Sequence, residues 1–163
     1  MMKKARKWII LGFLPAIFIG FLVWIYRPPL EIGGVYRSDD RESVVVEIGN
    51  SGYLPIKVRD VSINDGDAPT KVNVQVSHAL QGIIITKNYE DEESKKYQFR
   101  SLQDVAIQTG TDPKKTLEKF DDGSVTEEDL IYGLSVLHST PITEVTITYS
   151  YLGMSFHKTV SIP

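Results

Sequence analysis

The first 26 residues contain a long apolar run that limits what the whole chain can be. Trp8–Tyr26 comprises 19 residues without a charged side chain. At about 1.5 Å rise per residue, a helix of that length crosses most of a ~30 Å hydrocarbon layer. Trp8 at one end and Trp24 and Tyr26 at the other are aromatic residues of the kind that favours membrane–water interfaces. The run predicts a transmembrane helix over residues 8–26, anchored by these three side chains in the lipid bilayer.

Charge around the run predicts its orientation. Lys3, Lys4, Arg6 and Lys7 precede it, whereas Arg27 alone follows it closely. Basic residues accumulate on the cytoplasmic side of membrane helices. We therefore expect a single-pass protein of the cell membrane. Its expected parts are a cytoplasmic basic tail over 1–7, the span, a linker over 27–31 and an extracytoplasmic domain over 32–163.

A cleaved signal peptide is the competing interpretation, because it also begins with basic residues and an apolar run. Cleavage requires small residues before the scissile bond. The apolar run ends in bulky side chains from Phe21 to Tyr26, and the stiff sequence Arg27-Pro28-Pro29 follows. These residues favour an uncleaved anchor.

Small residues recur every four positions within the predicted span. Gly12, Ala16 and Gly20 would share one side of a helix, an arrangement that lets two membrane helices approach closely. The pattern predicts packing against another membrane protein or a second copy of this chain. The alternative is chance, because small residues are common in such helices and Pro15 interrupts the stripe.

Composition excludes several classes of chemistry. The sequence contains no cysteine, which rules out disulfides, thiolate metal sites and thiol nucleophiles. The segment after the span contains 14 of the 18 basic residues and all 21 acidic ones, a net charge of −7. It has no basic stripe, so we expect no nucleic-acid partner.

Alternating apolar residues predict that the outer segment is mainly β. Val44, Val46 and Ile48 alternate with other side chains, and a second apolar set begins at Leu54 after a Gly-Asn-Ser-Gly turn. The two stretches predict a hairpin over residues 43–58. The apolar phase then shifts, which predicts a bulge near Arg59-Asp60.

Two further strand patterns occupy the middle of the chain. Residues 71–77 place three valines on one face and polar side chains on the other. Residues 82–86 and 97–99 flank the acidic run Glu90–Glu93, which predicts another hairpin with a charged tip.

The C-terminal residues predict a strand register. If Tyr151 pairs with Met154 across the Leu152-Gly153 turn, Tyr149 lies opposite Phe156 and Val145 opposite Val160. Large apolar side chains then share one face.

One short helix is expected between the strands. Thr111-Asp112-Pro113 is a typical helix start, and Gly123 ends the pattern. Residues 125–137 fit either a second capped helix or a strand, and alternation favours the strand. Seven to nine short strands with one helical insertion predict an Ig-like antiparallel β-sandwich.

Two stretches resemble a known group of proteins. The run VVVEIGNSGYLPIKVRDVSIN resembles the opening hairpin of anchored Ig-like sandwich domains, including the water-stress (WHy) type. The run ITEVTITYSYLGMSFHKTVSI is similar to the closing hairpin of small single-pass membrane proteins of Bacillus-like bacteria. The resemblance implies a fold and a location but carries over no active site.

No motif indicates a reaction. His78, His138 and His157 do not have metal-binding spacing, and no nucleophile elbow or phosphate loop occurs. The acidic run Glu90–Glu93 and residues 118–129, which partly resemble an EF-hand loop, are candidate calcium sites, but Phe120 replaces an oxygen ligand. We expect no catalytic residue, metal or cofactor.

These observations favour a non-catalytic binding or interaction module at the cell envelope. The alternative is a small envelope-associated hydrolase whose site is built from loops.

Overall fold

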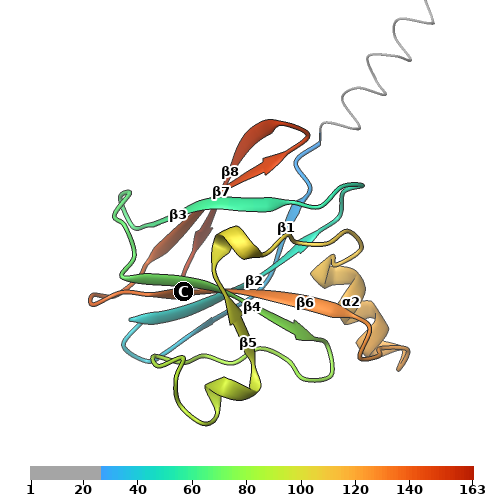
Figure 1. Ribbon diagram of the computed structural model, residues 1–163, viewed down its shortest axis with the longest axis horizontal. Coiled ribbons are helices and arrows are strands. Elements are labelled where there is room, and N and C mark those ends of the chain that lie inside the picture. The colour runs from blue at the N-terminus through green and yellow to red at the C-terminus, as the bar shows by residue number, and fades with distance from the viewer. Residues whose placement is uncertain (1–26) are drawn as a thin grey trace, which may run out of the picture.

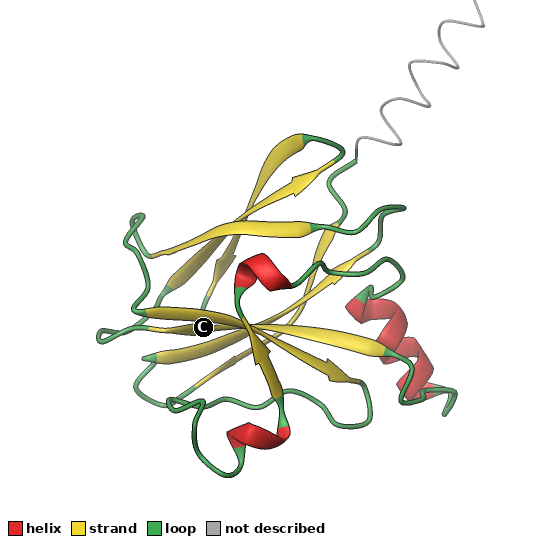
Figure 2. Cartoon of the chain, in the orientation of Figure 1, coloured by secondary structure: helices red, strands yellow, loops and turns green. Residues whose placement is uncertain are grey.

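A computed structural model describes residues 27–163 (Figures 1 and 2). The predicted span over 8–26, including Trp8, Trp24, Tyr26 and the Gly12, Ala16 and Gly20 stripe, lies outside the described residues. Within residues 27–163, no helix combines the length and the apolar character needed to cross a membrane.

The described chain is mainly β and forms two antiparallel sheets with one short α-helix, α2 (Pro113–Asp121). A five-stranded sheet has the order β1-β2-β6-β4-β5, and a three-stranded sheet has the order β3-β7-β8. The strands are β1 (Leu30–Arg37), β2 (Ser43–Asn50), β3 (Lys57–Ile63), β4 (Lys71–His78), β5 (Gln98–Arg100), β6 (Leu130–Leu137), β7 (Glu144–Tyr151) and β8 (Met154–Ser161). Two 3-10 turns, η1 (Ser94–Lys96) and η2 (Leu102–Asp104), flank β5. β1 begins inside the predicted 27–31 linker.

The hydrophobic core lies between the two sheets. Alternate residues of each strand face inward, as the period of a strand requires. From the larger sheet these include Val46, Ile48 and Leu134, and from the smaller sheet Ile147 and Tyr149, all at most 1% exposed.

Several sequence predictions are confirmed. β7 and β8 pair in the expected register, with Tyr149 opposite Phe156 and Tyr151 opposite Met154. The register of β3 against β7 shifts between Val58 and Asp60, where a bulge was expected. The expected helix is α2, and residues 130–137 form strand β6 rather than a second helix.

The predicted hairpin over residues 43–58 is wrong. β2 and β3 belong to different sheets, and β2 pairs instead with β1 and β6. The buried Asn50 side chain explains the change, because its amide donates hydrogen bonds to the carbonyls of Leu54 (2.9 Å) and Ile107 (3.0 Å). Asn50 thereby satisfies backbone acceptors where the chain crosses between sheets.

The predicted hairpin of residues 82–86 with 97–99 is also wrong, because residues 82–86 form no strand. Side chains of the sheet bond this segment in place of a strand ladder. Gln75 accepts from the Ile84 N–H (3.2 Å), and the Ser43 hydroxyl donates to the Thr86 carbonyl (2.8 Å). The segment covers the outer face of the five-stranded sheet, so Gln75, predicted on a polar face, is fully buried.

Candidate functional site

The candidate site begins with an irregularity in β1. Ile32 pairs with Ile48 and Val35 with Val46, so Gly33 and Gly34 together lie opposite the single residue Glu47. This is the residue count of a β-bulge, which often re-aims a side chain near a functional site. The Gly34 N–H donates a hydrogen bond to Glu47 Oε2 (2.9 Å) and holds the carboxylate on the outer face of the sheet.

The two glycines leave the space that the polar groups of the site occupy. A Cβ at Gly33 would lie 2.5 Å from Glu47 Oε2, and one at Gly34 would lie 2.4 Å from the Tyr36 hydroxyl oxygen. Partial burial, together with the nearby Glu47 carboxylate, raises the pKa of Tyr36 above its usual value of 10.0. The phenol is therefore a neutral neighbour of the carboxylate at physiological pH.

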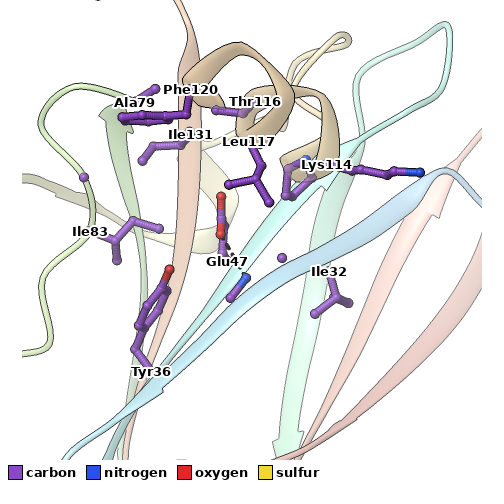
Figure 3. Close-up of a pocket in the computed structure, with 14 residues that line it drawn as sticks. Ile32, Tyr36, Glu47, Ala79, Ile83, Lys114, Thr116, Leu117, Phe120 and Ile131 are labelled. Atoms are coloured by element: carbon purple, nitrogen blue, oxygen red, sulfur yellow. Dashed lines mark hydrogen bonds between the residues drawn. The ribbon is translucent and has the colours of Figure 1, made fainter. Parts of the chain in front are cut away.

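Helix α2 forms a wall beside these groups. Asp112 caps its start by accepting a hydrogen bond from the Lys114 N–H (3.0 Å), and Pro113 occupies the first turn. Leu117 and Phe120 share the helix face that borders the site, although both remain exposed to solvent. The Lys114 side chain extends away from Glu47 (Figure 3).

Together these elements border a cleft of ≈ 600 Å³. That volume suits a small molecule or a few side chains of a peptide. Glu47 lies centrally among apolar side chains, with Tyr36 below it in the view of Figure 3. The apolar walls come from Ile32, Ala79, Ile83, Pro113, Leu117, Phe120 and Ile131.

Glu47 differs from several other carboxylates of the domain in its partners. Asp40 and Glu42 both pair with Lys87, and Asp129 pairs with Lys119. Within residues 27–163, Glu47 has no such cationic partner. A half-buried carboxylate among apolar groups is favourable only with compensating partners, and the Gly34 N–H supplies one.

The three histidines are not among the residues that line the cleft. His157 Nδ1 is 3.0 Å from Thr148 Oγ1 on the outer face of the smaller sheet, and His138 Nδ1 is 3.3 Å from Thr70 Oγ1. His78 lies at the end of β4. None of them borders the cleft.

The candidate calcium segments use their carboxylates for local hydrogen bonds. Asp122 accepts from the Ser124 N–H (2.9 Å), and Asp91 accepts from the Ser94 N–H (2.6 Å). The Ser124 and Ser94 side chains also bond these carboxylates, and they, followed by the backbone bonds, lower the pKa of Asp122 and Asp91. Among residues 27–163, no group of three or more histidine and acidic side chains is arranged to hold a metal ion.

Sequence reasoning missed Glu47 and the cleft. The available signals were an isolated glutamate within the apolar run VVVEIG and the pair Gly33-Gly34. No protein-family model, curated protein or solved structure matches the chain.

Proposed function

We propose that this chain is a membrane-anchored, extracytoplasmic binding module. The predicted span over 8–26 would hold it in the bilayer, with the basic tail in the cytoplasm and the sandwich outside. The stripe of Gly12, Ala16 and Gly20 would let the span pack against a second membrane helix.

We further propose that the sandwich is Ig-like, as the resemblance to anchored sandwich domains implies. The strand order supports this. β1-β2-β6-β4 corresponds to the A-B-E-D sheet of constant-type Ig domains, and β3-β7-β8 corresponds to C-F-G. β5 would then be an added edge strand beside β4.

The observation that carries the function is one carboxylate, Glu47, at the centre of a mainly apolar cleft. Lys114 and Thr116 also line the cleft, and the Lys114 side chain extends away from Glu47 (Figure 3). Such a cleft fits a ligand with a positively charged group joined to an apolar body, because the charge would meet Glu47 while the body covers the walls. The rings of Tyr36 and Phe120 beside the cleft could also contact a cation through their faces. The net charge of −7 on the outer segment would attract such ligands.

A binding role is favoured over the hydrolase alternative by the groups that border the cleft. Their polar members are Tyr36, Glu47, Lys114 and Thr116, so the cleft has no Ser–His or Cys–His pair and no second carboxylate beside Glu47. Glu47 is therefore proposed as a recognition residue.

Phenethylamine is a simple probe of this proposal, because it joins an ammonium group to an aromatic body. We expect it to bind the full-length chain in lipid nanodiscs more tightly than neutral phenylethanol, measured by calorimetry. Glu47→Gln should weaken phenethylamine binding by about ten- to a hundredfold, since a hydrogen bond to a charged group contributes about 1.5–3 kcal/mol. Phenylethanol binding should not change.

The matched control is Glu31→Gln, which removes the same charge from the same sheet outside this cleft. It should leave the preference for phenethylamine intact. Equal binding of both probes, or equal losses in both variants, would contradict recognition by Glu47.

A further inference from the structure

One end of the sandwich, where the described chain begins, carries a group of exposed apolar side chains. Tyr53 and Leu54 lie in the β2–β3 connection and are 61% and 49% exposed. Leu152 and Met154 lie at the β7–β8 turn and are each 37% exposed. We refer to these four residues as the anchor-proximal face.

Hydrogen bonds fix this face to the start of the described chain. The Ser51 N–H and hydroxyl both donate to the Pro29 carbonyl, at 3.0 and 3.2 Å. The Tyr53 N–H donates to the Tyr151 hydroxyl (3.1 Å), and this bond joins the β2–β3 connection to the end of β7. Figure 1 shows the β7–β8 turn beside the chain start. The β2–β3 connection, the β7–β8 turn and the start of the described chain are therefore parts of one packed unit.

The predicted span ends very close to this unit. It ends at Tyr26, whereas Pro29 is already buried and bonded within the sandwich. Only Arg27 and Pro28 lie between them, and a fully extended chain from Tyr26 to Pro29 covers about 10 Å. An anchored sandwich would thus be held with this end at the membrane surface.

We propose that the anchor-proximal face contacts the outer leaflet of the bilayer. Tyrosine favours the headgroup region, and Leu54, Leu152 and Met154 can enter the apolar boundary beneath it. The inference depends on the proposed anchor and deepens it, because it specifies which end of the sandwich faces the lipid.

A chain without cysteine allows a direct test with single introduced cysteines. Leu54→Cys and Leu152→Cys in the full-length chain would carry an environment-sensitive fluorophore in phosphatidylcholine–phosphatidylglycerol vesicles. The matched control is Ile85→Cys, because Ile85 is 38% exposed but lies near the start of β2, at the opposite end. We expect lipids bearing a quencher below the headgroup to quench the first two labels several-fold more strongly than the third.

Flotation of the vesicles after an alkaline wash separates the two ways of failing. If the chain does not float with the vesicles, both the proposed anchor and the contact are wrong. If it floats but labels at Leu54 and Leu152 are quenched no more than the label at Ile85, the anchor stands and the contact is wrong.

Discussion

Gly49 lacks a side chain where β2 passes beneath the start of α2. A Cβ there would lie 1.9 Å from the Thr111 carbonyl oxygen and 2.6 Å from Pro113 Cδ. The Thr111 hydroxyl also accepts a hydrogen bond from the Asn50 N–H (3.1 Å), so the two segments cannot separate without breaking it. The absence of a side chain at Gly49 thus lets α2, which forms a wall of the cleft, lie close to strand β2.

We expect Gly49→Ala to lower the free energy of unfolding by about 1–3 kcal/mol, the usual cost of overpacking. It should also weaken phenethylamine binding, because α2 must shift. Chemical unfolding measures the first effect and calorimetry the second. The control is Gln108→Ala, because Gln108 is exposed and lies in the connection between η2 and α2. It should change the free energy of unfolding by no more than about 0.5 kcal/mol. Unchanged stability in Gly49→Ala would mean that α2 is not packed on β2.

At the scale of single residues, sequence reasoning located features that depend on neighbouring residues better than contacts between residues far apart in the sequence. The helix start at Thr111-Asp112-Pro113 and the bulge near Asp60 follow from neighbouring residues, and both are confirmed. The proximity of Gly33, Glu47 and Pro113 depends on pairing between β1 and β2 and on where α2 docks. No local pattern specifies either, which is why the cleft was missed.

The β7–β8 hairpin was predictable as an element because its pairing is local. A two-residue turn and strict alternation leave one register that keeps the apolar side chains together, and that register is observed. The two mistaken hairpins had less regular segments and longer connections. Pro55 lies in one segment, and Ile83-Ile84-Ile85 in the other does not alternate. The first was redirected by Asn50, which lies within the predicted turn and bonds the Leu54 and Ile107 carbonyls. The second was redirected by Gln75 and Ser43, which lie outside the predicted hairpin.

In the β7–β8 hairpin, Phe156 stacks on Tyr149 with ring centroids 5.5 Å apart, whereas the next residue, His157, faces solvent. We expect Phe156→Ala to lower the free energy of unfolding by about 2 kcal/mol, less than for a fully buried aromatic residue. His157→Ala should cost no more than about 0.5 kcal/mol. Thermal unfolding compares the two, and greater damage from His157→Ala would contradict the register.

At the scale of the whole molecule, two sheets bury a shared core within residues 27–163. The strand alternation predicted this mainly β architecture, although it misassigned which strands pair. The basic N-terminal tail and the apolar run that follows it predict opposite sides of one membrane for the two ends of the chain. Display of the sandwich outside the membrane is the central inference, since the proposed role at the cell envelope and the proposed contact with the outer leaflet both depend on it.

Labelling of single cysteines in intact spheroplasts tests that display most directly. Ile85→Cys lies on the sandwich and Ala5→Cys in the basic tail, and the natural chain offers no competing thiol. With a membrane-impermeant maleimide, we expect Ile85→Cys to react in intact spheroplasts and Ala5→Cys to react only after permeabilisation. Reaction of Ile85→Cys only after permeabilisation would contradict an extracytoplasmic sandwich.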